Sequence, residues 1–295
     1  MQRVLRKLAQ LATVSAVALY GCRASDTVSS SGTIIAVQFY AGRFLVGADS
    51  RGSGEGVDPK DIDKECKITP LGEKMFFAMT GKTKVWDKSD RKTLLVDAHS
   101  AAKQAFRRFR SEPNTRGHIK NIADRWAAIV KSEFAEWSQL DPSEFVKETS
   151  EDYLASAVFG GTMSDGTLTA YIVYVQPYDE PMLNTARKPH VKTHVIPWNY
   201  NPSSTGQVWG AQDKDGVTEF YGGTSERADA ARARLRRAIA STPNADAEAL
   251  TMQFAIKAAL DWAIHKDEVG GKIDILELTR GGSVRWIAVK PACQD

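Results

Sequence analysis

The sequence predicts an α+β fold, because its apolar segments fall into separate blocks of strands and helices. Short apolar runs between Gly-, Asn- or Asp-containing turns indicate strands, and apolar residues at helical spacing indicate helices. Along the chain the order is strands, two helices, strands, two helices and strands. The packing rules for layered domains allow this order to form two stacked antiparallel sheets between helical layers.

The N-terminal segment, residues 1–32, predicts a signal peptide or propeptide in front of one folded domain at 33–295. The chain opens with a basic segment whose charged residues are Arg3, Arg6 and Lys7. A mostly apolar stretch follows over 8–20, which is shorter than the ~20 residues needed to span a membrane as a helix. This order is typical of a secretory signal, so we expect the protein to be exported.

The end of this segment indicates a lipid anchor. Leu19-Tyr20-Gly21-Cys22 resembles a bacterial lipoprotein cleavage box, which predicts a lipid on Cys22 as the protein's contact with a membrane. Two alternatives stay open. One is an ordinary signal cleaved near Ala24, which would give a periplasmic protein. The other is a plain propeptide on a cytoplasmic protein.

The folded domain is predicted to carry no net charge, which argues against a nucleic-acid partner. The whole chain has 39 basic and 36 acidic residues, and residues 1–32 hold four of the basic and one of the acidic ones. The remainder therefore holds 35 of each and lacks the basic excess of a nucleic-acid-binding domain.

The cysteines and histidines bear on redox and metal chemistry. If Cys22 is lipidated or removed, Cys66 and Cys293 remain. In an oxidising compartment these two could form a disulfide or stay as free thiols. No Cys-x-x-Cys or Cys/His spacing indicates a structural zinc. His190 and His194 share a face if they lie on a strand, but a lone histidine pair is more often structural or solvated. We therefore expect no metal and no cofactor.

The first part of the folded domain predicts a hairpin and two further strands. Apolar runs at 33–39 and 43–48 flank a three-residue turn at 40–42. Both runs are apolar at nearly every position, so both faces of these strands should be covered. After a Gly- and Asp-rich loop, strands are expected at 64–70 and 74–80.

The later elements follow from the same signals. Two amphipathic helices have apolar residues that recur from Leu95 to Phe109 and from Ile122 to Trp137. The remaining segments are predicted as a strand pair within 153–176, an insertion at 177–206, a second strand pair within 207–222, helices at 226–240 and 243–265, and strands at 272–279 and 283–289. These segments complete the order given above.

Asp49 and Thr33 are the candidate catalytic residues of the hairpin. Asp49 ends an apolar strand, where a carboxylate is costly unless it is paired, and Lys64 beyond the loop is a candidate partner. A lysine beside a carboxylate can orient a hydroxyl and move its proton. If the chain were cut between Gly32 and Thr33, Thr33 would carry a hydroxyl nucleophile and an α-amine. An α-amine has a pKa of ~7.7–8.0, which suits a general base at neutral pH.

These residues resemble the start of a proteasome β-type subunit, in the N-terminal nucleophile (Ntn) hydrolase superfamily. The family has a Gly-Thr processing junction, a hairpin ending in Ala-Asp-Ser-Arg, a lysine opening the third strand and a glycine after the fourth. In this chain the matching residues are Gly32-Thr33, Ala48-Asp49-Ser50-Arg51, Lys64 and Gly81. The segment 265–275 is similar to the family's Arg-Asp-x-x-Ser-Gly-Gly and following strand, with Val269 in place of the serine.

The resemblance implies a four-layer αββα sandwich and an N-terminal threonine amidohydrolase of the proteasome-like peptidase type. Thr33 would be the nucleophile, oriented by Lys64 and Asp49. The Gly81 N–H would stabilise the oxyanion, and Asp267 would complete the network. Peptides or small amides would be the substrates, a homo-oligomer could form, and the chemistry would need no cofactor.

Two other functions stay open. If the three-residue turn makes the hairpin longer than in the family, Gly32 takes the nucleophile position and the chain is a non-catalytic scaffold or binding subunit. A non-peptidase Ntn acylase would use the same residues on small amides. Thr224 or Ser225 could supply a further active-site hydroxyl, although a hydroxyl before a helix is most often an N-cap.

Overall fold

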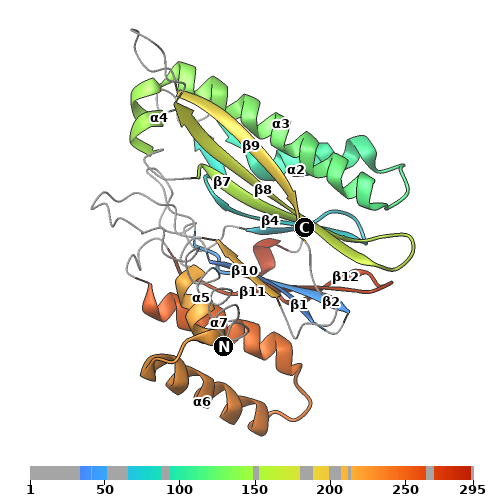
Figure 1. The fold of residues 1–295 in the computed structure, drawn as a ribbon, viewed down its shortest axis with the longest axis vertical. Coiled ribbons are helices and arrows are strands. Elements are labelled where there is room, and N and C mark those ends of the chain that lie inside the picture. The colour runs from blue at the N-terminus through green and yellow to red at the C-terminus, as the bar shows by residue number, and fades with distance from the viewer. Residues whose placement is uncertain are drawn as a thin grey trace, which may run out of the picture.

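The computed structural model describes residues 34–40, 42–51, 66–87, 93–148, 153–179, 189–198, 207–211, 214–263 and 269–293. Within these ranges the chain is α+β, with two five-stranded sheets and one two-stranded sheet. Helices border the two large sheets on their outer sides (Figure 1). The predicted targeting segment at 1–32 lies outside the described residues.

The first large sheet contains the predicted N-terminal hairpin. Its strands, in spatial order, are β10 (Gln207–Ala211), β1 (Ile35–Tyr40), β2 (Arg43–Ala48), β11 (Asp274–Thr279) and β12 (Val284–Ala288), and all neighbours are antiparallel. Tyr40 pairs with Arg43, which leaves two residues for the turn instead of the predicted three. Gly42 has a φ of 79°, the positive φ that a two-residue hairpin turn favours.

The second large sheet faces the first. Its strands, in spatial order, are β3 (Ile68–Pro70), β4 (Met75–Gly81), β7 (Ala155–Thr162), β8 (Leu168–Asp179) and β9 (Pro189–Pro197), again all antiparallel. Residues 75–80 of β4 are all buried. One face of β4 packs under the helices, and the other packs towards the first sheet. The prediction that the two hairpin strands are covered on both faces is confirmed by the buried residues of β1 and β2.

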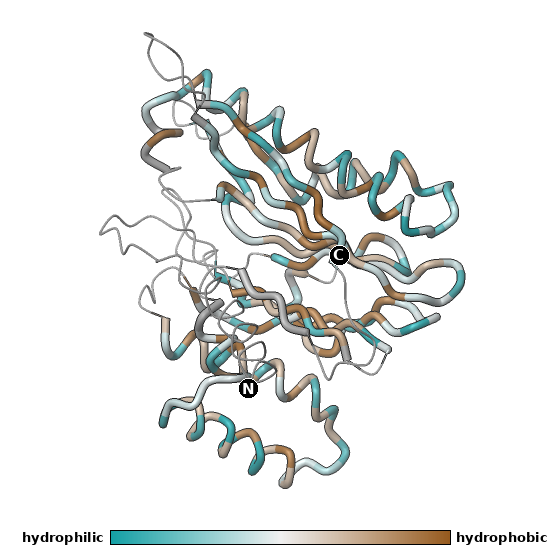
Figure 2. The backbone as a smooth tube through the Cα atoms, viewed as in Figure 1, coloured by the Kyte–Doolittle hydropathy of each residue, from teal (hydrophilic) through white to brown (hydrophobic). Residues whose placement is uncertain are grey.

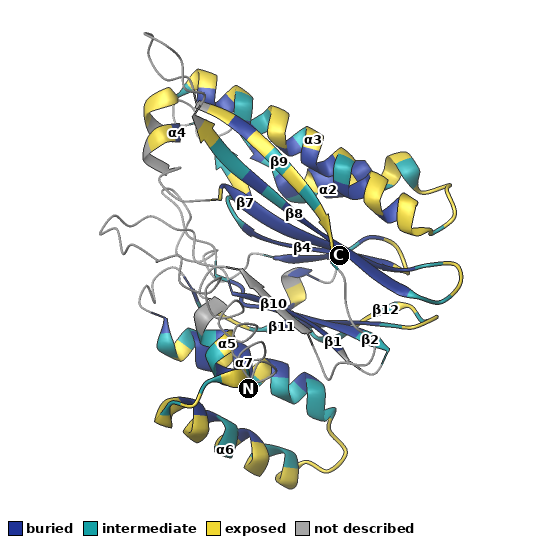
Figure 3. Cartoon of the chain, viewed as in Figure 1, coloured by how far each residue is buried: buried dark blue, intermediate teal, exposed yellow. Residues whose placement is uncertain are grey.

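Helices cover the outer face of each sheet. The described helices are α2 (Ala98–Phe109), α3 (Arg116–Leu140), α4 (Pro142–Glu148), α5 (Lys214–Gly222), α6 (Glu226–Ser241) and α7 (Ala247–Trp262), with a short 3-10 helix η1 (Pro291–Cys293). The small sheet, β5 (Lys84–Trp86) and β6 (Leu94–Asp97), leads into α2. Helices α2 and α3 pack on the second sheet, and α5 and α7 pack on the first. Figure 2 shows apolar segments on the strands and helices of these layers, and Figure 3 shows that the strands of both large sheets are largely buried. The four-layer αββα sandwich of the Ntn hydrolases stays a prediction.

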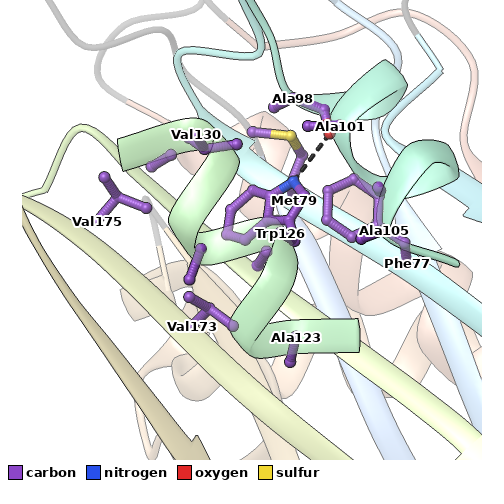
Figure 4. Close-up of a cluster of buried hydrophobic side chains, with 14 of the residues drawn as sticks. Phe77, Met79, Ala98, Ala101, Ala105, Ala123, Trp126, Val130, Val173 and Val175 are labelled. Atoms are coloured by element: carbon purple, nitrogen blue, oxygen red, sulfur yellow. Dashed lines mark hydrogen bonds between the residues drawn. The ribbon is translucent and has the colours of Figure 1, made fainter. Parts of the chain in front are cut away.

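Trp126 anchors α3 over the second sheet (Figure 4). Its side chain is fully buried against the rings of Phe77 and Phe159. A buried indole N–H needs an acceptor, and Nε1 donates to the Ala98 carbonyl at 2.9 Å. One side chain thus holds α3, the first residue of α2 and the strands beneath them in a fixed relation.

Residues 189–197, predicted as part of an insertion, form the strand β9 instead. Val191 and Val195 pack into the core beneath α3, while the residues between them are half-buried or exposed. This period-two pattern is that of a strand with one covered face. The two prolines, Pro189 and Pro197, led to the prediction of an insertion, although proline is compatible with the ends of an edge strand.

Residues 214–222, predicted as part of a strand pair, form the helix α5, whereas the preceding residues form β10 as predicted. Val217 and Phe220 are spaced for one helical face and are both buried. A Cβ on Gly216 would lie 2.8 Å from the Ala259 Cα of α7, so glycine allows the two helices to approach closely. Packing against α7 outweighs the strand preference of the valine and the aromatic residues in this segment.

Candidate active site

Asp49 is the centre of the candidate site, because its carboxylate gathers three separate segments of the chain. It follows β2 directly and is fully buried. Its Oδ1 accepts hydrogen bonds from the Ile34 backbone N–H at 2.9 Å and from Lys67 Nζ at 3.0 Å. Its Oδ2 accepts a hydrogen bond from the Gly270 N–H at 2.9 Å. Three donors, one of them charged, offset the cost of removing a carboxylate from water.

The lysine that pairs with Asp49 is Lys67, which the sequence pattern did not single out. Its side chain is fully buried, and it stands immediately before β3. Its carbonyl accepts a hydrogen bond from the Met79 N–H of β4 at 3.1 Å, which fixes its backbone to the second sheet. Since Asp49 ends a strand of the first sheet, the ion pair joins the two sheets. Lys64, the predicted partner, lies outside the described residues.

Gly270 closes the site from the C-terminal side. Its carbonyl accepts hydrogen bonds from the N–H groups of Ser50 and Arg51, at 3.0 and 3.1 Å. Its φ is +152°, a conformation that residues with a Cβ rarely adopt, so the position favours glycine. The structure thus brings together two segments that carry the family resemblance, although Asp49 and Gly270 are 221 residues apart.

Of the other predicted site residues, the structure describes only Gly81. Thr33, Lys64 and Asp267 lie outside the described residues. The described chain begins at Ile34, which makes two hydrogen bonds with Asp49, one as donor and one as acceptor. The Ile34 N–H donates to the Asp49 carboxylate, and the Asp49 N–H donates to the Ile34 carbonyl at 3.1 Å. The chain therefore enters β1 directly beside the buried carboxylate.

Gly81 ends β4 at the same end as the ion pair. It lies two residues beyond Met79, whose N–H binds the Lys67 carbonyl. Gly81 has a φ of +90°, and a Cβ on it would lie 2.5 Å from the Leu154 carbonyl oxygen. Any other residue would have to move the backbone of the neighbouring strand, so the position requires glycine.

A second buried ion pair, between Asp274 and Lys290, lies next to the first. Asp274 opens β11, and its two carboxylate oxygens accept hydrogen bonds from the backbone N–H and Nζ of Lys290, at 2.8 and 3.0 Å. Burial lowers the pKa of Lys290, its hydrogen bond to Asp274 opposes this shift, and the Lys67 ammonium adds to it. The sequence pattern did not lead us to this pair, although Asp274 shows the same signal as Asp49, a carboxylate at one end of an apolar strand.

A disulfide joins Cys66 to Cys293 beside the two ion pairs, with the Cα atoms 5.6 Å apart. This resolves the alternative between a disulfide and two free thiols that the sequence left open. Cys66 directly precedes Lys67, and Cys293 ends η1. The Cys293 N–H donates to the Lys290 carbonyl at 3.0 Å. The site is therefore tied covalently to the C-terminal segment.

His99 of α2 holds β3, the strand that follows Lys67. Its Nδ1 lies 2.8 Å from Thr69 Oγ1, and its ring packs edge-on against Phe77. Burial lowers the pKa of His99 from 6.5 to about 4. The imidazole therefore stays neutral at pH 7 and positions β3 by a neutral hydrogen bond.

Acid should destabilise the protein through His99. Between pH 6.5 and 4 the unfolded chain takes up a proton on His99 that the folded chain does not hold. The free energy of unfolding therefore falls with decreasing pH, by about 3 kcal/mol in total. Burial raises the pKa of Glu133 to about 7, which gives the opposite trend between pH 7 and 4.5, but its half-exposed side chain reduces that effect.

Urea denaturation of a His99→Gln variant at pH 7 and pH 4.5 measures this contribution. The variant should lose less stability than the wild type over this interval, because it lacks the group that gains a proton on unfolding. A Glu133→Gln variant is the matched control and should lose more than the wild type. Equal losses in His99→Gln and the wild type would contradict the prediction.

The sequence also suggested Ser225 as an active-site hydroxyl and considered His190 and His194 as metal ligands, and the structure supports neither role. Ser225 is the N-cap of α6, and its Oγ accepts a hydrogen bond from the Ala228 N–H at 3.2 Å. His190 and His194 are exposed on β9, where four residues span about 13 Å, too far for both to bind one metal ion. In the described ranges, no group of three or more His, Cys, Asp or Glu residues is placed to hold a metal.

The export prediction depends on residues 1–32, which lie outside the described part of the chain. Among the helices that the structure does describe, none combines the length and the apolar character of a membrane span. The predicted lipid on Cys22 likewise stays a prediction.

The family resemblance is also a prediction from sequence motifs, carried by the two segments that meet at Asp49. Comparison with known proteins adds no family to this site: no protein-family model matches the chain, and no curated protein is similar enough to match it.

Proposed function

We propose that this chain is an N-terminal threonine amidohydrolase of the proteasome-like peptidase type, activated by cleavage between Gly32 and Thr33. One observation carries the proposal: the same Asp49 oxygen binds the Ile34 N–H and the Lys67 ammonium. Thr33 is the residue before Ile34, and consecutive Cα atoms are about 3.8 Å apart. We therefore propose that cleavage presents the Thr33 hydroxyl to the buried Lys67 ammonium.

In this mechanism Thr33 Oγ1 attacks the substrate carbonyl carbon. Its proton passes to the α-amine of Thr33, directly or through one water. The Lys67 ammonium takes the role that the sequence motif predicted for Lys64, since it hydrogen-bonds the hydroxyl oxygen and favours its deprotonated form. Asp49 holds Lys67 in place. The protonated amine then gives its proton to the leaving nitrogen, and water hydrolyses the ester that remains on Thr33.

Two further residues have roles in the proposal. The Gly81 N–H stabilises the oxyanion, and one such donor is commonly worth ~2.7–4 kcal/mol. Asp267 completes the network from the segment that precedes Gly270. The reacting groups are thus supplied by the polypeptide, so the proposed chemistry needs no organic cofactor and no metal.

The fold is consistent with this proposal. Helices pack on the outer faces of two facing antiparallel sheets, as expected for a four-layer αββα sandwich over residues 33–295. The hairpin pairs without a break from Ile35 with Ala48 to Tyr40 with Arg43. Because the predicted three-residue turn is absent, the main argument for Gly32 at the nucleophile position is weakened. That favours an enzyme over a non-catalytic scaffold or binding subunit, and both functions are compatible with a homo-oligomer.

The disulfide supports export, because such bonds persist mainly in oxidising compartments. We propose that the precursor leaves the cytoplasm and carries a lipid on Cys22 until cleavage before Thr33 releases the enzyme. A single acyl chain holds a protein only marginally, so the anchor would need several chains. The lipid is the proposed contact with the membrane, and the neutral domain has no proposed nucleic-acid partner.

Intact mass and N-terminal sequencing of active protein test the proposal. We expect Thr33 as the first residue, together with hydrolysis of peptide amides. An active protein that begins at Gly32 or earlier would overturn it. A panel of short peptides and small acyl amides separates a peptidase from an Ntn acylase, because the acylase would hydrolyse only the small amides. Absence of hydrolysis in a protein that begins at Thr33 would favour the scaffold.

A further inference from the structure

Two links on neighbouring residues, an ion pair and a disulfide, join the two sheets at one end. The Lys67 ammonium reaches Asp49 at the end of β2, with both side chains fully buried. The Cys66 sulfur, one residue earlier, is bonded to Cys293, which lies 227 residues away in sequence. The ion pair and the disulfide therefore lie side by side between the sheets.

The far end of the disulfide is fixed to the same strand pair that carries Asp49. Cys293 follows Lys290, whose backbone N–H and ammonium both donate to Asp274. Asp274 pairs with Ala48, the residue before Asp49. Lys67 is thus connected to Asp49 by a second route. It runs through the disulfide to Cys293, through the Lys290–Asp274 ion pair, and through the pairing of Asp274 with Ala48 in the first sheet.

Without the disulfide, few described contacts hold the Lys67 backbone. β3 has only three residues, and in the described sheet it pairs with β4 alone. The ladder is continued at Lys67 by one hydrogen bond, from Met79. An ammonium gains hydration when it leaves a buried site, so we expect the segment at Lys67, just before β3, to open locally once the disulfide is reduced.

We propose that the Cys66–Cys293 disulfide positions Lys67 on Asp49, so that the candidate site assembles only after the two thiols are oxidised. Its consequence for catalysis rests on the proposed amidohydrolase function. A small or protein disulfide, R–S–S–R, supplies the oxidant. A Cys66 or Cys293 thiolate attacks it and releases one R–S⁻, and the remaining thiolate displaces the second R–S⁻ from the mixed disulfide. The two cysteine protons pass to solvent or to the released thiolates. The enzyme would thereby stay inactive in a reducing cytoplasm.

Lysine labelling of the folded protein tests the inference without relying on activity. The full chain is acetylated with an N-hydroxysuccinimide ester before and after reduction by tris(2-carboxyethyl)phosphine, and each lysine is followed by peptide mass spectrometry. We expect Lys67 to be protected in the oxidised protein and to react about tenfold faster or more after reduction, because its segment opens locally. Lys120, whose side chain is 49% exposed, should react equally in both states.

A Cys66→Ser/Cys293→Ser variant is the matched control. It should label Lys67 as the reduced wild type does and should not respond to the reductant. Hydrogen exchange of β7 and β8, which β4 separates from β3 in the sheet, should be unchanged on reduction. Continued protection of Lys67 after reduction overturns the inference. Simultaneous loss of protection in β7 and β8 also overturns it, because the disulfide would then stabilise the whole fold.

Amide hydrolysis in unlabelled aliquots of the oxidised and reduced protein separates this inference from the proposed function. Activity that falls on reduction, in step with Lys67 exposure, supports both. An oxidised protein that begins at Thr33 and hydrolyses nothing contradicts the function, while the labelling still decides whether the disulfide positions Lys67. Unchanged activity together with increased Lys67 labelling overturns the claim that the site must assemble for catalysis.

Discussion

Lys67→Met should reduce amide hydrolysis by about 10²–10⁴, the usual range for a group that assists proton transfer in the transition state. The methionine side chain is close to lysine in size, so the buried space stays filled. The variant loses the positive charge that orients the nucleophile, and Asp49 is left without its charged partner. Removing one partner of a buried pair costs about 3–5 kcal/mol of stability.

A double variant separates the two effects of this change. Asp49→Asn/Lys67→Met removes both charges, so it should be more stable than Lys67→Met while remaining equally inactive. Thermal melts and single-turnover assays on the same preparations provide the comparison. Near-normal turnover in Lys67→Met would contradict its proposed role and would favour a purely structural ion pair.

An exposed ion pair supplies the control for stability. Lys120 and Asp124 are 2.6 Å apart at the surface of α3, with side chains 49% and 42% exposed. Exposed pairs at this helical spacing are worth only ~0.3–0.5 kcal/mol. Lys120→Met should therefore leave both the melting temperature and the turnover almost unchanged, which shows that the effect at Lys67 comes from burial.

The centre of the candidate site was predictable from sequence, because the cost of burying a charge acts locally. A carboxylate at the end of an apolar strand needs a partner, and this requirement marks Asp49 as a residue that must be paired. The same requirement applies to Asp274, which opens the buried strand β11. The glycine at position 270 was expected from the resemblance, but the positive φ that favours it arises only where this segment meets Asp49 in the fold.

The sequence did not identify which lysine pairs with Asp49. A polar loop precedes β3, and a strand's first residue depends on its hydrogen bonds to a neighbour, here the bond from Met79 to the Lys67 carbonyl. Lys64 and Lys67 both lie near that boundary, so local pattern alone did not separate them. The disulfide could not be predicted from local pattern either. Cys66 and Cys293 are 227 residues apart in sequence, and only the fold brings their side chains together.

Thr33→Ala should abolish both cleavage after Gly32 and amide hydrolysis, the largest effect expected from a single change in this chain. Alanine has no hydroxyl, so neither the propeptide bond nor a substrate can be attacked. We expect a loss of at least about 10³ in kcat/KM, as for removal of other nucleophiles. Thr33→Ser is the matched control, because it keeps the hydroxyl and should keep maturation with reduced turnover.

The same variant tests location, since uncleaved protein would keep its anchor. The Thr33→Ala precursor should stay in the membrane fraction and take up radiolabelled palmitate on Cys22, whereas the wild type should be soluble outside the cytoplasm. Cys22→Ser should remove the label and release the Thr33→Ala precursor from the membrane. Wild-type protein that is wholly cytosolic, with no label on Cys22, would instead make residues 1–32 a plain propeptide. The cytosol is reducing, so in that case Cys66 and Cys293 should be found as free thiols in those cells.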